Sequence, residues 1–298
     1  MSEYSLGGLF NLEGFELPRI GYGMGGITRK AAQGESEQKN AIELLQETYD
    51  LGIRHFDTAQ FYGNGLANTL LNSAFSEVRE NVFIASKVGA RAVEGMPPMA
   101  AAQKPHELRE AIESNLKTLN TDYLDMVYMR RMDFQPSLIA EGDQQVELAA
   151  QLDELNKLRE EGKIRRIGLS HVTLEQVQQA LDAPISSISN IYTMLHRQDE
   201  PLLALAREND VAWAPYFPLG GASYADLPRV AEHETVQHIA KELDATPTQV
   251  AIKWQLAHSP NTLLITGTAS HDHLHENVAA ADLSFSAEQF AELEKLGL

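Results

Sequence analysis

The sequence predicts an α/β fold, a (β/α)8 TIM barrel, from three observations. Short apolar, β-prone segments alternate with segments of helical periodicity along the chain. Eight strand segments occur, and 298 residues is a fitting length for eight β/α units. No linker rich in proline and serine interrupts the alternation, so we expect residues 1–298 to form a single domain.

The alternative fold is a doubly wound open sheet, whose first strand usually enters a helix through a G-x-G-x-x-G turn. The nearest match here is GYGMGG, residues 21–26, and no helical pattern follows it immediately. The barrel is therefore the preferred interpretation.

The expected elements follow one another in regular order. Strands are predicted within residues 18–26, 53–59, 81–89, 124–131, 164–170, 186–192, 211–216 and 262–267, and helices within 36–52, 106–119, 151–162, 174–181, 201–209 and 246–259. In the first of these helices Ser36 is the candidate N-cap and Gly52 the stop signal. Residues 89–105 are too long and too rich in Gly and Pro for a minimal turn, which indicates an active-site loop that covers the pocket.

Composition excludes several classes of function. With 24 basic and 42 acidic side chains the net charge is −18, which argues against a nucleic-acid partner. The chain has no cysteine, so disulfides and thiolate metal sites are excluded. We see neither a signal-peptide pattern nor an apolar run near the ~20 residues of a membrane span. A cytoplasmic protein without a membrane partner is expected, and its oligomeric state stays open.

Polar residues at the ends of the predicted strands are the candidates for chemistry, because barrel enzymes react at the carboxyl ends of their strands. These candidates are Asp57, Lys87, Arg130, Arg131, Ser170, His171 and Tyr216, and Tyr62 lies five residues beyond Asp57 in the same loop.

Asp57, Tyr62 and Lys87 would suit proton transfer. A tyrosine is a poor acid at neutral pH, a neighbouring ammonium stabilises its phenolate, and a carboxylate can hold that ammonium in place. Two alternatives stay open at this point. Asp57 could cap a turn while Lys87 forms a structural ion pair, or Lys87 could be the Schiff-base nucleophile of a barrel aldolase.

The segment HDHLH places His271, His273 and His275 at alternate positions. Without a paired carboxylate, alternating histidines are more typical of a solvated turn than of a metal cluster. We therefore expect no metal site.

Taken together, these segments resemble the aldo-keto reductase superfamily, in the family's order and along nearly the whole chain. FDTAQFYG resembles its first catalytic segment and IASKVG its lysine segment, while IRRIGLSH resembles the strand that ends in Ser-Asn beside the nicotinamide amide. YFPLGG resembles the segment whose aromatic residue, here Tyr216, stacks on the nicotinamide. ITGTASHDHLHEN resembles the cofactor-phosphate loop, which ends in Glu276 and Asn277.

The resemblance implies a barrel with an N-terminal β-hairpin within residues 4–17, and hydride transfer between NADP(H) and a small-molecule carbonyl or alcohol. Tyr62 would give the proton to the carbonyl oxygen, and Asp57 and Lys87 would adjust the acidity of Tyr62. The implied cofactor-binding residues are Gly23, Met24, Asp57, Ser170, His171, Ser189, Tyr216, Phe217, Leu219, Gly267, Thr268, Ser270, His275, Glu276 and Asn277.

The first departure from the family pattern is Arg130, where the family usually has a histidine. An arginine can donate hydrogen bonds to a carbonyl oxygen as charge develops there, but it cannot relay a proton. We expect Arg130 to orient the substrate electrostatically. The alternative is a structural ion pair with Asp57 or Asp125, and for Arg131 a loop-holding role is the preferred interpretation.

Two further departures concern the cofactor. Ser189 stands where many relatives have a glutamine that holds the carboxamide, so either Asn190 replaces that contact or the contact is lost. The segment GTASHDHLHEN has no Arg or Lys for a 2′-phosphate, which leaves protonated histidines, Thr268 and Ser270. NADP(H) is the expected cofactor on family grounds, and NAD(H) is not excluded.

Arg130 together with VGAR and FPLGG narrows the resemblance to a bacterial branch that includes pyridoxal reductases. Pyridoxal has an anionic phenolate beside its aldehyde, which a fixed cation would complement. Other aromatic or sugar-like carbonyl compounds fit the same description. The alternative from another class is a nicotinamide-nucleotide-sensing binding subunit with vestigial catalysis.

Overall fold

The computed structural model describes residues 4–94, 99–221 and 225–297. Eight parallel strands form one sheet in the order β11-β10-β9-β8-β5-β4-β3-β12, and a parallel bridge between Trp213 and Thr262 joins its two edges. The strands are β3 (Ile20–Gly23), β4 (His55–Asp57), β5 (Phe83–Val88), β8 (Met126–Arg130), β9 (Ile167–Ser170), β10 (Ile185–Ser189), β11 (Ala212–Trp213) and β12 (Leu264–Thr266). The predicted (β/α)8 barrel is thereby confirmed.

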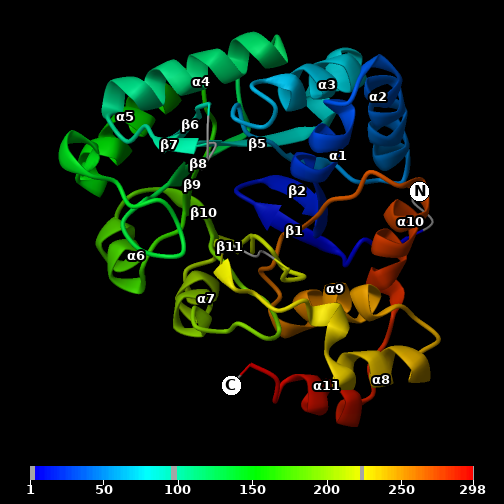
Figure 1. Cartoon of the computed structure of the whole chain (residues 1–298). Coiled ribbons are helices and arrows are strands. Elements are labelled where there is room, and N and C mark those ends of the chain that lie inside the picture. Colours follow the sequence, from blue (N-terminus) through cyan, green and yellow to red (C-terminus); the bar gives the residue numbers. More distant parts are fainter. Residues whose placement is uncertain (1–3, 95–98, 222–224, 298) are drawn as a thin grey trace.

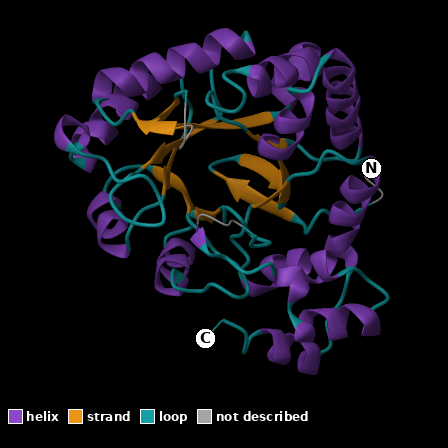
Figure 2. Cartoon of the chain, in the orientation of Figure 1, coloured by secondary structure: helices purple, strands orange, loops and turns teal. Residues whose placement is uncertain are grey.

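Helices surround the barrel on its outside, as Figures 1 and 2 show. They are α1 (Met24–Ala31), α2 (Glu35–Asp50), α3 (Leu66–Phe75), α4 (Pro105–Leu119), α5 (Leu148–Glu160), α6 (Leu174–Ala180), α7 (Glu200–Glu208), α8 (Glu234–Glu242), α9 (Pro247–His258), α10 (His271–Ala279) and α11 (Ala287–Leu293). Local signals explain where several of them begin. In α9, for example, Thr246 caps the helix, Pro247 follows at the first position, and Gln249 completes a capping box.

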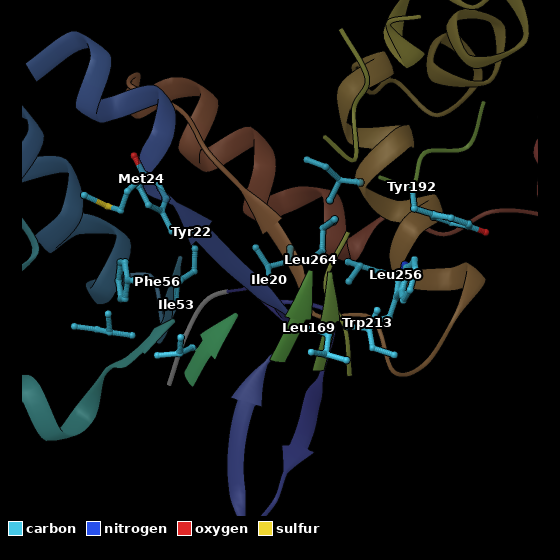
Figure 3. Packing of buried hydrophobic residues seen from close by; sticks show 14 of the residues in the cluster. Ile20, Tyr22, Met24, Ile53, Phe56, Leu169, Tyr192, Trp213, Leu256 and Leu264 are labelled. Carbon is cyan, nitrogen blue, oxygen red and sulfur yellow. The ribbon is translucent and has the colours of Figure 1, made fainter. Parts of the chain in front are cut away.

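Apolar side chains fill both sides of the strand wall. Between strands and helices lies the main core, to which Tyr22, Phe56 and Leu169 contribute, as Figure 3 shows. The barrel interior is a separate cluster, in which Leu12 and Leu17 meet Phe83, Ala85, Met126, Tyr128, Ala212, Ala214 and Leu263. Because strands of a parallel barrel are covered on both faces, they read in the sequence as continuous apolar runs.

The N-terminal hairpin is also confirmed. Strands β1 (Leu9–Leu12) and β2 (Phe15–Pro18) pair antiparallel, and Figure 1 shows them across the centre of the barrel. Their side chains Leu12 and Leu17 are buried among the first residues of the barrel strands. The hairpin therefore closes the amino-terminal end, and leaves the carboxyl end of the barrel for chemistry.

Two local expectations were wrong. Helix α1 begins at Met24, inside GYGMGG, and the two glycines in its first turn had hidden the helical pattern. The N-cap of α2 is Gly34 and not Ser36, since the helix begins at Glu35, two residues earlier than a cap at Ser36 implies. The long loop contains a small hairpin, β6 (Ala90–Ala92) with β7 (Met99–Ala101), while residues 95–98 lie outside the described chain.

In the described part of the chain we find no helix with the length and apolar character that crossing a membrane requires.

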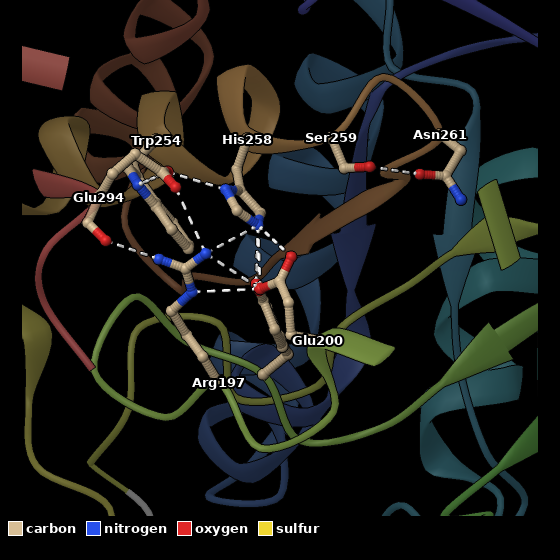
Figure 4. A network of polar contacts seen from close by, with 8 residues as sticks. Arg197, Glu200, Trp254, His258, Ser259, Asn261 and Glu294 are labelled. Carbon is tan, nitrogen blue, oxygen red and sulfur yellow. Dashed lines mark hydrogen bonds and ion pairs between the residues drawn. The ribbon is translucent and has the colours of Figure 1, made fainter. Parts of the chain in front are cut away.

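A polar cluster on the outside of the barrel links three helices, as Figure 4 shows. The imidazole of His258, at the end of α9, lies 2.8 Å from the carboxylate of Glu294 and 3.0 Å from that of Glu200. Arg197 donates to Glu200 at 3.1 Å, and the indole of Trp254 donates to Glu294 at 2.8 Å. The cluster ties the end of α11 to α9 and to the start of α7.

This cluster predicts an acid-sensitive contribution to stability. Burial alone would raise the pKa of Glu200, but hydrogen bonds from His258 and Tyr192 lower it to about 2. An unfolded glutamate titrates near pH ~4.3, so this contribution is present above that pH and is lost as the pH falls toward 2. Because the Glu200 side chain is 39% exposed, screening limits the loss to about 1 kcal/mol.

We therefore expect Glu200→Gln to flatten the fall of the thermal midpoint between about pH 4.5 and pH 2. Glu208→Gln, at the exposed end of α7, is the matched control and should keep the wild-type slope. Equal slopes for wild type and Glu200→Gln would contradict this assignment.

Candidate active site

The structure brings the predicted strand-end residues to one end of the barrel. Asp57, Arg130, Ser170 and Ser189 are the last residues of β4, β8, β9 and β10, and Lys87 lies one residue before the end of β5. Neighbouring strands keep them in register, since Arg130 pairs with Ser170 and Ser170 with Ser189. The expectation that these side chains meet at one rim is therefore met.

Asp57 and Lys87 form a buried ion pair. The ammonium of Lys87 donates to the Asp57 carboxylate and, at 3.0 Å, to the carbonyl oxygen of Thr58, and the two side chains are only 13% and 11% exposed. Burial lowers the pKa of Lys87, but its interactions with Asp57 and Tyr62 outweigh burial and raise it. A Schiff-base lysine needs a lowered pKa to act as a nucleophile. This site keeps Lys87 as an ammonium, which argues against the aldolase alternative.

Tyr62 lies beside this pair. The Lys87 ammonium nitrogen is 5.1 Å from the centroid of the Tyr62 ring. The turn after β4 places the ring, because the Tyr62 amide donates to the carbonyl of Ala59 at 3.0 Å and Gly63 follows in the left-handed conformation. A phenol, an ammonium and a carboxylate are thus adjacent, as proton transfer requires.

Arg130 has no acidic partner within the described residues. Its guanidinium donates to the hydroxyl of Ser137 at 3.3 Å, lies 5.4 Å from the centre of the Tyr216 ring, and has a buried Nε with no hydrogen bond. The two carboxylates proposed for a structural ion pair have other cations. Asp57 binds Lys87, and Asp125 lies 2.8 Å from Arg79. The ion-pair alternative for Arg130 is therefore wrong.

Arg131 has the loop-holding role expected of it. Its guanidinium donates to both carboxylate oxygens of Asp133, at 2.7 and 2.9 Å, and to the carbonyl of Val146 at 2.8 Å. It is also 93% buried, with a relative exposure of 7%. The paired arginines at the end of β8 thus divide into one that braces the loop and one that faces the rim.

The end of β9 carries two different groups. The hydroxyl of Ser170 is buried and has no hydrogen-bond partner among the described residues. His171 is engaged at both ring nitrogens, with the Tyr216 hydroxyl and the Phe134 carbonyl each at 2.9 Å. Ser170 is therefore free to bind a ligand amide, whereas His171 is committed to protein contacts.

Asn190 does not replace the missing glutamine. Its side-chain amide donates to the carbonyl of Val172 at 2.7 Å and to Asp199 at 2.8 Å, and its oxygen accepts from the Val172 amide at 3.0 Å. Both of its donors are used inside the protein. Of the two possibilities left open, loss of that contact is the one that fits the structure.

The segment that resembles the phosphate loop enters α10. Ser270 caps this helix, and its amide donates to the hydroxyl of Thr268 at 3.1 Å. Free amides at a helix N-terminus attract anions, so this position fits a cofactor phosphate. Packing also explains the glycine at position 267, because a Cβ there would lie 2.7 Å from the carbonyl oxygen of Gly23.

The histidines of HDHLH were expected in a solvated turn, but they lie in the first turns of α10. His271 and His275 both bind the carboxylate of Glu47 on α2, the latter at 2.7 Å. A carboxylate partner therefore exists, although it lies 228 residues from His275 in the sequence. Glu276 and Asn277 lie on the same helix, and Asn277 is buried.

The other predicted cofactor residues have different surroundings. Gly23 ends β3 and precedes α1, whereas the side chain of Met24 is fully buried in the main core. Phe217 packs edge-to-face on Tyr216, with ring centres 5.4 Å apart, and Leu219 packs on the main core.

Two residues beside the site were missed from the sequence. Phe134 stacks on His171 with ring centres 4.0 Å apart. Gln103 donates to the carbonyl oxygens of Gly89 and Arg130, at 2.6 and 2.8 Å, and so fixes the end of β8. Both lie in long loops without periodic patterns, where the sequence offers no comparable signal.

The structure thus brings Asp57, Tyr62 and Lys87 together at the carboxyl end of a barrel, as the resemblance to the aldo-keto reductases implied. The model described as "Aldo/keto reductase family" matches residues 19–297, which is nearly the whole chain. The chain belongs to the aldo/keto reductase family, and the expectation of an NAD(P)H-dependent oxidoreductase that acts on small carbonyl compounds is confirmed.

Relatives extend over the full length. The chain is 36% identical to the pyridoxine 4-dehydrogenase of Escherichia coli K12, covering 96% of each protein, and 29% identical to a probable aldo-keto reductase 1 of Glycine max, covering 94% of this chain and 86% of that one. A Klebsiella pneumoniae aldo-keto reductase solved with NADPH superposes with a TM-score of 0.77 at 27% identity, covering 95% and 92%. A thermostable aldo-keto reductase solved with the inhibitor epalrestat superposes with a TM-score of 0.79 at 28% identity, covering 97% of this chain and 98% of that one.

Proposed function

We propose that residues 1–298 form one domain that reduces an aldehyde or ketone with NADP(H), with pyridoxal to pyridoxine as the leading reaction. The observation that carries this proposal is the buried Asp57–Lys87 pair beside Tyr62 at the carboxyl end of the barrel. The relative from E. coli supports the choice of a pyridoxine and pyridoxal substrate. The K. pneumoniae reductase, solved with NADPH, supports the choice of cofactor.

In this mechanism Tyr62 is the general acid. When bound, the cofactor would supply the hydride for the carbonyl carbon. Tyr62 gives its phenolic proton to the carbonyl oxygen, so that an alcohol forms and a phenolate remains on the enzyme. The Lys87 ammonium stabilises that phenolate, and Asp57 keeps the ammonium in place.

The rim offers groups that suit a nicotinamide dinucleotide. The unpartnered hydroxyl of Ser170 would bind the carboxamide, Tyr216 would stack on the ring, and the capped start of α10 near Thr268 and Ser270 would take the phosphate. Glu276 and Asn277 would lie toward the adenosine. His271 and His275 already bind Glu47, so they are weaker candidates for the 2′-phosphate than the sequence alone suggested.

Arg130 would select the substrate. In a chain with a net charge of −18 it is a cation without an acidic partner in the described structure, and its Nε is buried and unbonded. An anionic oxygen next to the reacting carbonyl would satisfy both the charge and the donor. Pyridoxal has such an oxygen in its phenolate, ortho to the aldehyde.

The test compares pyridoxal with pyridine-4-carboxaldehyde, which lacks the phenolate, in wild type and Arg130→His. We expect the variant to lose about 10- to 100-fold in kcat/KM for pyridoxal, because a charge-assisted hydrogen bond is lost, and to change little for the control aldehyde. Steady-state oxidation of NADPH measures both. An equal change for the two aldehydes would show that Arg130 does not face the substrate anion.

A further inference from the structure

His171 occupies the position where the family pattern has a residue beside the nicotinamide amide, yet its ring faces the protein. Nδ1 lies 2.9 Å from the Tyr216 hydroxyl and Nε2 lies 2.9 Å from the carbonyl oxygen of Phe134. The imidazole also stacks on the Phe134 ring, at 4.0 Å between centres and 18° between planes. Only 2% of the residue is exposed, so no polar atom of the ring is left for a cofactor.

The partners fix the direction of both hydrogen bonds. A carbonyl oxygen only accepts, so Nε2 carries the hydrogen and donates it to Phe134. Burial lowers the pKa of His171, which keeps the ring neutral near pH 7. Nδ1 then has a free lone pair and accepts from the Tyr216 hydroxyl. The hydroxyl of Tyr216 is thus anchored, which restricts the rotation of its ring.

The other partner of His171, Phe134, lies in the loop that follows Arg130. Phe134 lies four residues after Arg130, and the loop between them is braced by Asp133, which accepts from Arg131 and from Gln176 on α6 at 2.6 Å.

The charged groups that act on His171 are Arg130 and Asp133. On the side of β10, the carbonyl oxygen of Ser189 accepts a hydrogen bond from the backbone amide of His171 at 3.0 Å. His171 therefore joins the loop after β8 to the aromatic residue after β11.

We propose that His171 is a positioning residue that holds the Tyr216 ring in place for stacking against the nicotinamide and couples it to the loop after Arg130, without binding the carboxamide itself. This inference rests on the proposed function, because it assumes that a nicotinamide stacks on Tyr216. The backbone of His171 is left-handed, with φ of +57°, a conformation that asparagine tolerates well. His171→Asn is therefore a backbone-compatible change whose side chain is too short to reach both partners. Because asparagine is also the family's residue beside the nicotinamide amide, His171→Gln is measured in parallel, and the expectations for Kd apply to both variants.

A double-mutant cycle with Tyr216→Phe tests the proposal. Tyr216→Phe keeps the stacking ring and removes only the hydroxyl that His171 holds. We expect each single variant to raise the Kd of NADPH about five- to tenfold, and the double variant to raise it no further than either single one. The Kd is measured by quenching of protein fluorescence, and His238→Asn, an exposed histidine on α8, is the control that should bind normally.

Two results would overturn the role of His171. One is multiplication of the two single effects in the double variant, and the other is an unchanged Kd in His171→Asn. If His171→Asn fails to fold, His171→Gln takes its place in the cycle with the same expectation. Failure of the proposed function is distinguishable, because wild-type protein would then bind no NADPH or would turn over no carbonyl compound.

Discussion

Tyr62→Phe is expected to lower the rate of carbonyl reduction by about 10³-fold and to leave the Kd of NADPH within about twofold of wild type. The phenol supplies the proton in the proposed mechanism, and the substitution removes the hydroxyl that carries it while keeping the ring. The ring stays in its turn after β4, packed edge-to-face on Phe61 at 5.2 Å, so the fold of the loop should not change.

The measurement needs kcat with pyridoxal and a separate binding titration with NADPH. Tyr49→Phe is a matched control, since Tyr49 lies on α2, where Arg54 stacks on its ring. It should change neither quantity. Survival of more than about a tenth of the wild-type rate in Tyr62→Phe would mean that another group is the acid.

Lys87→Met is expected to have the second largest effect, a loss of about 10²- to 10³-fold in kcat. Without the ammonium, the phenolate left on Tyr62 loses the cation that lies beside it, and the Asp57 carboxylate stays buried without its partner. Removing one partner of a buried pair costs about 3 kcal/mol or more, so the thermal midpoint should fall as well.

The double variant Asp57→Asn with Lys87→Met separates these two effects. It removes both charges, so we expect stability to recover in part while catalysis stays lost. Recovery of activity in the double variant would contradict a catalytic role for the ammonium. Trapping of a carbonyl compound on Lys87 by borohydride would restore the Schiff-base alternative.

Much of the barrel could be predicted from the sequence because its signals are local. Eight apolar runs and the helices between them follow from burial of parallel strands on both faces. The same geometry predicts the rim, since Asp57, Lys87, Arg130 and Ser170 follow such runs and must meet where the strands end.

The rest depends on contacts between residues far apart in the sequence. The two bonds of His171 join it to residues 37 and 45 positions away, and Glu47 reaches His275 across 228 positions. No periodic pattern reports such pairings. The commitment of Asn190 to Val172 and Asp199 is of the same kind. So is the finding that the described residues offer Arg130 the hydroxyl of Ser137 and no carboxylate.

One conformational error has a different cause. Helix α1 was missed because Gly25 and Gly26 weaken its pattern, although the barrel packs its side chains Ile27 and Ala31 into the core. Tertiary packing here outweighs intrinsic helix propensity, and a single sequence does not display that packing.

The central claim is that this rim transfers hydride from NADPH to a carbonyl compound with an anionic neighbour. The most direct test is the initial rate of NADPH oxidation by the purified protein with pyridoxal, with pyridoxine identified as the product. We predict stoichiometric formation of pyridoxine and a faster rate with pyridoxal than with pyridine-4-carboxaldehyde. Tight binding of NADPH without turnover of either aldehyde would contradict the account and favour a nucleotide-sensing subunit.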